Sequence, residues 1–450
     1  MILGQPVLIA LALAIVPQSG KTYALREGEL TDPTLVPLAL ERPLALGLAG
    51  ALLPAPRSFE EQGRKLRIDT NGDGRMDKTI SASKASIVEF DFDGEGRSLL
   101  LYSKEGDWMA SPARLWRVKI GKSSLELLDA NMDGEFEGRE DWLRWKGGCF
   151  FRQEVKGLLP TENGLARFEL VPKSGRLKLT LESLPRPEWA NDLQWEALLA
   201  VNELRNASGL GPWTLDMERS IACQKHAEYL YLNNYDYKAP WDGVGSHDEI
   251  EGNPGFSKEG REAARNSSTS SSNDPAGTVI RQFQTMLHRT GYLGSSTSPF
   301  AVGSVDRSQN TARGYSVLWG SEPTPASIRD VVVHPAPGQV LSELAGRGER
   351  PPVEHAPNFY GRTRGYPISV SFGRQPLQNI DLLVFAMGEK GPLQGELFTP
   401  ERPIHSSRPS NAHTAFFSPE GPLKPGKTYR AEFRATDRGS PVQLIWYFNT

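Results

Sequence analysis

The sequence predicts a multidomain protein in which an all-β region, a central α+β region and an Ig-like β-sandwich follow one another. The chain has 450 residues, which is more than one hydrophobic core usually holds. It contains 44 Gly and 34 Pro, and this combination favours turn-rich β structure over a helical bundle. Helical periodicity is concentrated between residues 190 and 322, with short strand-like runs before and after it.

The composition is that of a globular chain, because 38% of the residues are apolar and 23% are charged. The net charge is only −3. Charge therefore gives no reason to expect binding to nucleic acid or to an anionic membrane surface.

The N-terminus carries an apolar stretch, "VLIALALAIV", at residues 7–16. Ten residues are too few for a helix that crosses ~30 Å of hydrocarbon. The stretch suits the apolar core of a secretory leader, and small residues follow at Ser19, Gly20 and Ala24. We predict a leader at residues 1–24, export to the periplasm, cell surface or medium, and no membrane span after cleavage. A buried N-terminal strand is the alternative.

Short β-branched or aromatic runs, separated by Gly, Asp and Asn turns, fill residues 60–185 and predict a β-rich domain. The preceding residues 25–59 are rich in Leu and Pro and receive no assignment. Similar runs, such as "YPISVSFG" and "VQLIWYFNT", occupy residues 328–450. Their number and length are typical of an Ig-like β-sandwich.

Three helices are predicted between residues 190 and 322. The first, "QWEALLAVNELRNASG", ends at Gly209, and the second is capped by Asp216. The third, "DPAGTVIRQFQTMLHRTG", is capped by Asp274 and ends at Gly291. The polar run between the second and third helices, "ARNSSTSSSN", is expected to be a loop.

The two cysteines, Cys149 and Cys223, fall in different predicted domains, and no CxxC or Cys/His metal spacing is present. A disulfide is one possibility in an exported protein. Two buried free thiols are the favoured interpretation.

Two stretches of the first β region read D-x-N-x-D-G, a pattern whose alternate oxygens can surround calcium. The weaker loop would use Asp69, Asn71, Asp73, the backbone carbonyl of Arg75, and Asp77. The stronger loop would use Asp129, Asn131, Asp133, the backbone carbonyl of Glu135, Glu137 and Glu140. The stronger loop has Glu140 at the twelfth position, whereas the weaker one has Ile80 there. The alternative is that Asn, Asp and Gly simply form hairpin turns.

The seven histidines differ in context. His226 lies on the apolar face of the second predicted helix and is expected in the core. Four histidines of the C-terminal region have no mutual spacing and are assigned to the surface: His334, His355, His405 and His413. This leaves His247, in a glycine-rich loop beside acidic residues, and His288, at the end of the third helix.

Several motifs between residues 190 and 322 occur in a familiar order: "NELR", a Gly-Leu loop, "HAEYL", "SH" with His247, and "MLHR" with His288. This stretch resembles the CAP superfamily (cysteine-rich secretory, antigen 5 and pathogenesis-related 1 proteins, or SCP-like), in its bacterial multidomain form. The resemblance implies an α-β-α sandwich and an exported location. It also implies a cleft in which two histidines and two acids can hold a divalent metal such as Zn²⁺.

The family's acidic residues are not at their usual places, where Arg265, Asn266 and Gln284 stand instead. Three nearby acids are candidates to replace them: Glu249, Glu251 and Glu259.

Three functions are compatible with this sequence. The first is non-catalytic binding of a small amphipathic ligand or a cell-surface polymer. The second is a divalent-metal-dependent hydrolase that uses His247 and His288 as metal ligands or as acid and base. The third is a structural surface protein with a calcium-stabilised β domain. The chain has no HExxH or GxSxG motif, and we therefore expect binding rather than catalysis.

Overall fold

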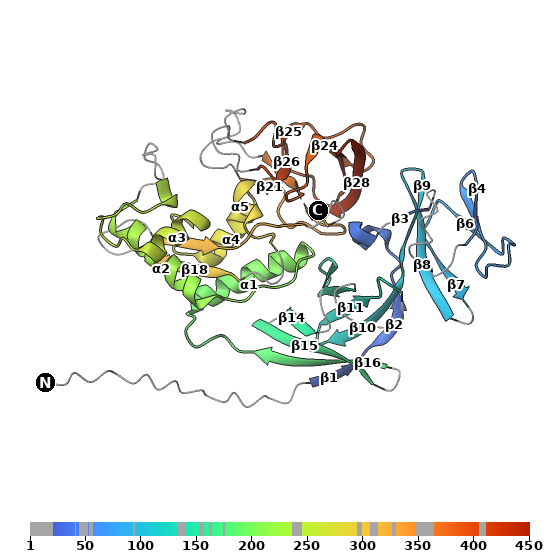
Figure 1. The fold of residues 1–450 in the computed structure, drawn as a ribbon, viewed down its shortest axis with the longest axis horizontal. Helices are drawn as coiled ribbons and strands as arrows, with labels where there is room; N and C mark the ends of the chain where they lie inside the picture. The colour runs from blue at the N-terminus through green and yellow to red at the C-terminus, as the bar shows by residue number, and fades with distance from the viewer. Residues whose placement is uncertain are drawn as a thin grey trace.

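The structure is a computed structural model that describes most of the chain after residue 20. The described residues are 21–40, 42–44, 53, 57–92, 95–132, 141–152, 156–161, 164–173, 176–235, 245–294, 299–306, 314–325, 330–347, 364–404 and 411–450. Over these residues the chain forms 28 strands in eight sheets and five α-helices (Figure 1).

Two sheets of the N-terminal region pack face to face. One has the order β1-β16-β15-β14 and the other the order β13-β12-β11-β10-β2. The strands of the first are β1 (Lys21–Ala24), β14 (Lys156–Thr161), β15 (Gly164–Lys173) and β16 (Arg176–Leu184). Those of the second are β2 (Arg26–Glu29), β10 (Arg114–Ile120), β11 (Ser123–Leu128), β12 (Trp142–Trp145) and β13 (Phe151–Arg152). Alternating apolar side chains such as Leu127, Leu143 and Phe168 fill the space between them.

Two further sheets extend from this region at the right of Figure 1. One has the order β3-β9-β8-β7 and the other the order β4-β5-β6. The first contains β3 (Arg42–Pro43), β7 (Ser86–Phe92), β8 (Glu95–Lys104) and β9 (Asp107–Pro112), and the second contains β4 (Phe59–Gln62), β5 (Lys65–Ile68) and β6 (Lys78–Ser81). They share a core around Ile68, Phe90 and Leu99.

The residues around the predicted leader and the unassigned segment are partly described. Residues 1–20 lie outside the described residues. Residues 21–24, which we had included in the leader, form β1 and pair with β16 from Lys21–Leu181 to Ala24–Lys178. The unassigned segment contributes β2 and β3 and two short 3₁₀ turns, η1 (Pro33–Leu35) and η2 (Leu38–Leu40).

The helices lie together in the middle of the chain. They are α1 (Asp192–Ala207), α2 (Met217–Leu232), α3 (Lys258–Asn266), α4 (Pro275–Phe283) and α5 (Leu287–Thr290). Asp216 and Asp274 cap α2 and α4 through their side-chain oxygens, as predicted, and Asn191 forms a capping box with Gln194 on α1. The predicted third helix is interrupted, because α4 ends at Phe283 and α5 begins separately.

The polar run that we expected to be a loop begins inside α3. Ser257 caps this helix by accepting the amide N–H of Gly260 at 2.9 Å. The rest of the run forms the short strand β17 (Ser268–Ser270), which pairs with β19 (Tyr315–Trp319). β19 also pairs with β18 (Ala301–Val305).

The C-terminal region consists of strands again. Its sheets have the orders β20-β23-β26-β25, β24-β27-β28 and β21-β22. The strands are β20 (Val332–His334), β21 (Ala345–Gly346), β22 (Arg364–Gly365), β23 (Ile368–Ser371), β24 (Leu377–Ala386), β25 (Gly395–Phe398), β26 (Thr414–Pro419), β27 (Thr428–Asp437) and β28 (Ser440–Asn449). One apolar core, which includes Val370, Val384 and Phe433, joins the two larger sheets.

The predicted fold class is wrong. We expected an all-β domain, a central α-β-α sandwich and an Ig-like sandwich. The described chain is instead mostly β-strand, divided among many small sheets, and a central α-β-α sandwich is not evident. The helical periodicity predicted α1 and α2 correctly but missed α3 and joined α4 to α5, and it is a local signal. It does not reveal that β17, β18 and β19 have only 3, 5 and 5 residues.

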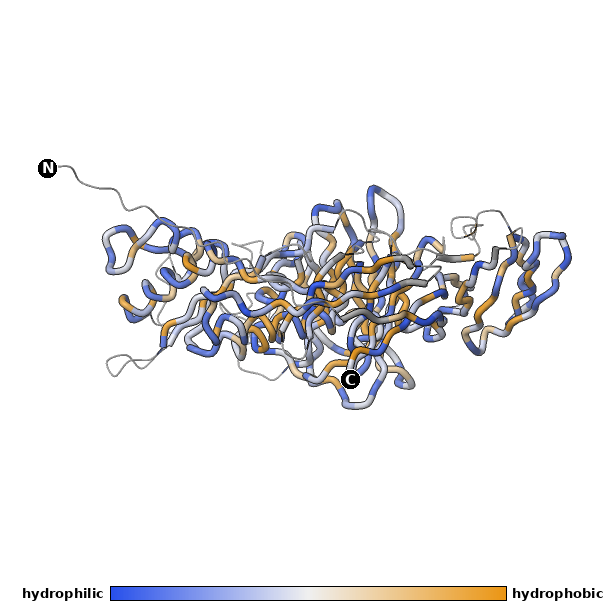
Figure 2. Tube along the Cα trace, turned by 90° about the horizontal axis from the view of Figure 1, so that it is seen from below, coloured by the Kyte–Doolittle hydropathy of each residue, from blue (hydrophilic) through white to orange (hydrophobic). Residues whose placement is uncertain are grey.

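Small sheets leave many main-chain carbonyls outside hydrogen-bond ladders, and several of them are buried. Arg205 on α1 is fully buried and donates to three such carbonyls, those of Gly211 (2.9 Å), Tyr292 (2.7 Å) and Gly294 (3.1 Å). Its guanidinium also lies 3.9 Å from the ring centroid of Trp213. Figure 2 shows apolar residues along the interior of the molecule, where such polar groups depend on internal partners.

We expect Arg205→Met to lower the free energy of unfolding by on the order of 3 kcal/mol, because buried carbonyls would lose their donors. Urea unfolding followed by tryptophan fluorescence measures this. The control is Arg438→Met, which removes an arginine whose side chain is 82% exposed and should change stability by less than about 0.5 kcal/mol. Equal stability of the two variants would contradict the role given to Arg205.

Candidate functional site

The weaker predicted calcium loop turns its oxygens toward its own backbone. Asp69 is buried and accepts the amide N–H groups of Gly72 (2.7 Å) and Gly74 (3.0 Å). Asn71 accepts from the amide of Asp73, and Asp73 accepts from that of Arg75. The loop thus has the hydrogen bonds of a tight turn, and calcium would have to share these oxygens.

Asp77, the last residue of this loop, accepts from both the amide and the hydroxyl of Thr70, at 3.0 and 2.6 Å. These hydrogen bonds, the hydroxyl first, lower the pKa of the Asp77 carboxyl.

The stronger predicted calcium loop is only partly described. Asp129 is fully buried, and Asn131 is exposed. The other four candidate ligands, Asp133, Glu135, Glu137 and Glu140, lie outside the described residues. Calcium binding in this loop therefore stays a prediction.

The two histidines of the predicted cleft lie on different elements. His247 ends the short 3₁₀ turn η6 (Gly245–His247), and its Nδ1 is 3.3 Å from the carbonyl oxygen of Ala264 on α3. His288 is on α5, with Nδ1 3.4 Å from the Thr285 hydroxyl. Each of these two contacts is to a neutral group, a main-chain carbonyl for His247 and a side-chain hydroxyl for His288.

The three candidate acids have different surroundings. Glu249 is buried, and Glu259 is on the surface in an ion pair of 3.2 Å with Lys225. Glu251 is exposed. Within the part of the chain that the structure describes, no group of three or more His, Cys, Asp or Glu side chains is arranged to hold a metal ion. Zinc in this cleft thus remains a prediction from the family resemblance.

The partner of Glu249 is His226 on α2. Glu249 Oε1 is 2.9 Å from His226 Nδ1, and its Oε2 accepts the amide of Ser257 at 3.0 Å. His226 Nε2 is 2.9 Å from the carbonyl oxygen of Ser246, which can only accept, so Nε2 carries a proton. Both side chains have no exposed surface.

This pair confirms that His226 is a core residue. It fastens the loop at 246–257 to α2, next to His247. The sequence did not reveal it, because Glu249 is 23 residues from His226 and was assigned to the cleft instead. An acid with a buried histidine partner is no longer available to serve His247.

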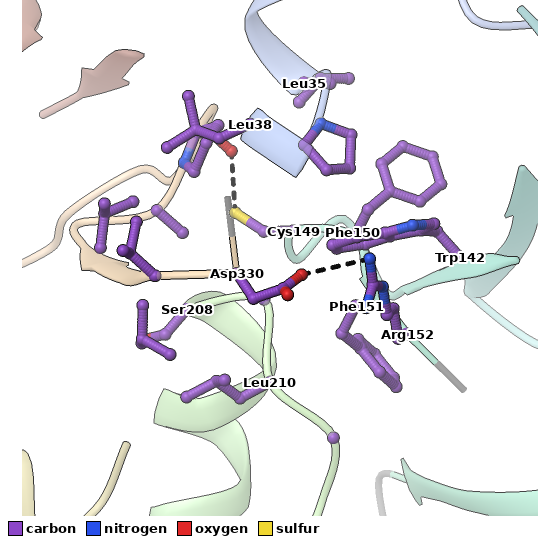
Figure 3. A pocket seen from close by; sticks show the side chains of 18 residues that line it. Leu35, Leu38, Trp142, Cys149, Phe150, Phe151, Arg152, Ser208, Leu210 and Asp330 are labelled. Atoms are coloured by element: carbon purple, nitrogen blue, oxygen red, sulfur yellow. Dashed lines mark hydrogen bonds and ion pairs between the residues drawn. The ribbon is translucent and has the colours of Figure 1, made fainter. Parts of the chain in front are cut away.

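A pocket of about 250 Å³, here called the junction pocket, lies where the N-terminal sheets, the end of α1 and the start of the C-terminal region meet (Figure 3). Its walls come from four segments and are mostly apolar. The residues are Leu35, Pro37 and Leu38; Trp142, Cys149, Phe150, Phe151 and Arg152; Ser208, Gly209, Leu210 and Gly211; and Asp330, Val331, Val332, Val333, Ala336 and Pro337. None of them was singled out as a binding residue from the sequence.

Two polar contacts cross this pocket, and Figure 3 shows both. Arg152 forms an ion pair of 3.2 Å with Asp330, and its guanidinium lies 5.4 Å from the ring centroid of Trp142. The Cys149 thiol donates to the carbonyl of Pro337 at 3.1 Å. Burial raises the pKa of Cys149 to about 12, so the thiol is neutral. Cys149 and Cys223 are both free and buried, which confirms the favoured interpretation.

Ser208 lies on the pocket wall and contacts a buried histidine. Its Oγ donates to the carbonyl of Leu204 at 2.7 Å and is 3.0 Å from His334 Nδ1. His334 Nε2 is 2.8 Å from the hydroxyl of Tyr366. The Tyr366 hydroxyl is also 3.4 Å from the carbonyl oxygen of Phe283. The three shorter contacts are satisfied together when Tyr366 donates to Nε2, Nδ1–H donates to Ser208, and Ser208 donates to Leu204. The opposite tautomer would satisfy the Phe283 contact but leave the 2.7 Å contact to Leu204 without a donor. In the arrangement that satisfies the shorter contacts, the imidazole is neutral and Ser208 is not activated as a nucleophile.

His334 was predicted to be on the surface, and this is wrong, because only 1% of it is exposed. β20 carries it into the contact between α1 and the C-terminal region. Of the other three histidines assigned to the surface, His413 is exposed, and His355 and His405 lie outside the described residues. Desolvation, helped by the nearby Arg289 cation, holds the pKa of His334 well below its usual value of 6.5.

The lowered pKa of His334 predicts that the protein loses stability as the pH falls below about 6.5. Between the two pKa values, the unfolded chain binds a proton at this histidine and the folded chain does not. The unfolding free energy should therefore be smaller at about pH 5.5 than at about pH 7.5. His334→Gln should flatten this dependence, and His413→Gln, at an exposed site, should not. Urea titrations at both pH values test this, and equal slopes for all three proteins would contradict it.

Comparisons with known proteins identify one distant structural similarity and no family. No protein-family model matches the chain, and no curated protein matches it. Among solved structures, the chain is similar to the 1.5 Å crystal structure of an extracellular protein containing an SCP domain from Bacillus anthracis str. Ames. The match covers 66% of this chain and 98% of that one, with 12% identity and a TM-score of 0.22. Such a score does not establish membership of the CAP family.

In the described part of the chain, none of the helices combines the length and apolar character needed to cross a membrane.

Proposed function

We propose that this chain is an exported, SCP-like protein that binds a ligand in the junction pocket without transforming it. The apolar stretch at residues 7–16 and the small residues after it support export. The ordered motifs between residues 190 and 322 support the SCP-like character. Calcium bound by the loop that begins at Asp129 would stiffen the N-terminal sheets.

The observation that carries the proposal is the pocket itself. Ligand sites are typically concave and largely apolar, with a few polar groups, and they often lie where domains meet. The junction pocket has all of these features, with aromatic walls from Trp142, Phe150 and Phe151 and one ion pair.

The chemistry of the pocket favours binding over catalysis. Its thiol, Cys149, is neutral at physiological pH because burial raises its pKa. Its hydroxyl, Ser208, gives its proton to a main-chain carbonyl at 2.7 Å, and the His334 tautomer that keeps this short contact donates to Ser208 rather than accepting from it. A nucleophile needs a base that accepts its proton, and neither group has one in this arrangement.

The binding function predicts that N-phenyl-1-naphthylamine, an uncharged fluorescent probe, binds one site per chain and raises the melting temperature. Leu210→Trp should fill the pocket and abolish the fluorescence gain. Leu232→Trp adds the same side chain at an exposed position of α2 and should leave binding unchanged. Absence of probe binding to the unsubstituted protein, or equal binding to both variants, would contradict the proposal.

A metal-dependent hydrolase is the second candidate, supported by His247 and His288 at the family's histidine positions. Under the binding function we expect calorimetric titration of the chelator-treated protein with Zn²⁺ to show no stoichiometric site. Zinc binding that disappears in a His247→Ala/His288→Ala variant would instead support the hydrolase and justify a substrate screen.

A further inference from the structure

The charged groups of the junction pocket are balanced. Among the described residues that line it, Arg152 and Asp330 are the only charged ones, and they pair with each other at 3.2 Å. Their side chains are 50% and 29% exposed, which places the pair at the rim rather than deep among the apolar walls. The pair links β13, which contains Arg152, to Asp330, two residues before β20 begins at Val332.

Because the two charges are paired, the pocket disfavours both anionic and cationic ligands. A carboxylate could bind Arg152 only by competing with Asp330, whose own charge would then lose this counterion. An ammonium group could bind Asp330 only at the expense of Arg152. A charged ligand therefore gains little, because each contact that it makes with one member of the pair replaces the contact between the two.

A neutral hydrogen-bonding group avoids this conflict. An alcohol or a primary amide can donate to the carboxylate of Asp330 and accept from the guanidinium of Arg152 while the two stay paired. The guanidinium has five N–H donors, so the existing ion pair leaves donors for a ligand oxygen.

The rest of the pocket fits an apolar body. Trp142, Phe150 and Phe151 form an aromatic wall (Figure 3). Aliphatic residues such as Leu210 and Val332 also line the pocket. The volume of about 250 Å³ lies just below the ~300–1,000 Å³ of ordinary ligand sites, and this restricts the ligand to a compact body of about one to three rings.

We infer that the junction pocket selects a small uncharged molecule with a compact apolar body and one hydrogen-bonding end, such as an alcohol or amide. This inference rests on the proposed binding function and specifies its ligand class. The ion pair of Arg152 and Asp330 acts as the selectivity element at the rim.

Three probes with the same body test the inference: 4-phenyl-1-butanol, 4-phenylbutanoate and 4-phenylbutylammonium. Binding is measured by displacement of N-phenyl-1-naphthylamine from the full chain. We expect the alcohol to bind the unsubstituted protein about tenfold more tightly than either ion.

Two substitutions change the charge of the rim and should change the order of binding. Asp330→Asn leaves Arg152 without this counterion, and the carboxylate should become the best ligand. Arg152→Gln leaves Asp330 without it, and the ammonium should become the best ligand. The control is Arg434→Gln, which removes a cation from the exposed face of β27 and should leave the alcohol preferred.

The outcomes separate the inference from the function on which it rests. Tighter binding of either ion to the unsubstituted protein, an unchanged order in both rim variants, or no binding of any of the three probes would overturn the inference. In each case, N-phenyl-1-naphthylamine that still binds and is lost in Leu210→Trp would leave the binding function intact. If the naphthylamine itself does not bind, both proposals fail. Melting curves of each variant verify that it is folded.

Discussion

The structure depends on side chains that donate hydrogen bonds to buried main-chain carbonyls. In the part of the chain that the structure describes, eight small sheets and many loops leave such carbonyls without ladder partners. Arg205 donates to three of these carbonyls inside the helical region. Arg289 donates to the carbonyls of Phe283 and Pro367, which lie in different regions. The Cys149 thiol donates to the carbonyl of Pro337, and the Trp446 indole donates to that of Pro335.

These contacts also explain why a pocket can exist between regions. Arg289 joins the segment after α4 to the C-terminal strands, and its guanidinium lies 4.5 Å from the ring centroid of Tyr366. Tyr366 in turn forms a hydrogen bond with His334, and His334 forms one with Ser208 on the pocket wall. Walls from distant parts of the sequence are thereby fixed relative to one another, and the cavity between them has a defined shape and charge.

Local features of the fold could be predicted from the sequence, and long-range ones could not. Asp216 and Asp274 were recognised as helix caps because a cap acts within three residues. The apolar face around His226 was recognised from its spacing. The burial of His334 and the hydrogen bond between Glu249 and His226 depend on residues that are far apart along the chain. Sequence periodicity therefore does not predict them. The same limit explains the error in the fold class. Of the candidate site, His247 could be placed in a turn, whereas His288, predicted at the end of the third helix, lies in the separate α5. The junction pocket could not be anticipated, since each wall segment looks ordinary by itself.

The position of the pocket has a consequence for the order in which the protein acquires its properties during synthesis. Residues 35–38, 142–152 and 208–211 emerge from the ribosome before the wall at 330–337 exists. That wall includes β20, which is held in its sheet by β23, some 35 residues later. The pocket is therefore complete only when the chain has been made and folded as far as β23. A chain that ends before β20 has the first three walls but lacks the fourth, so the binding that we propose would require the C-terminal region to have folded.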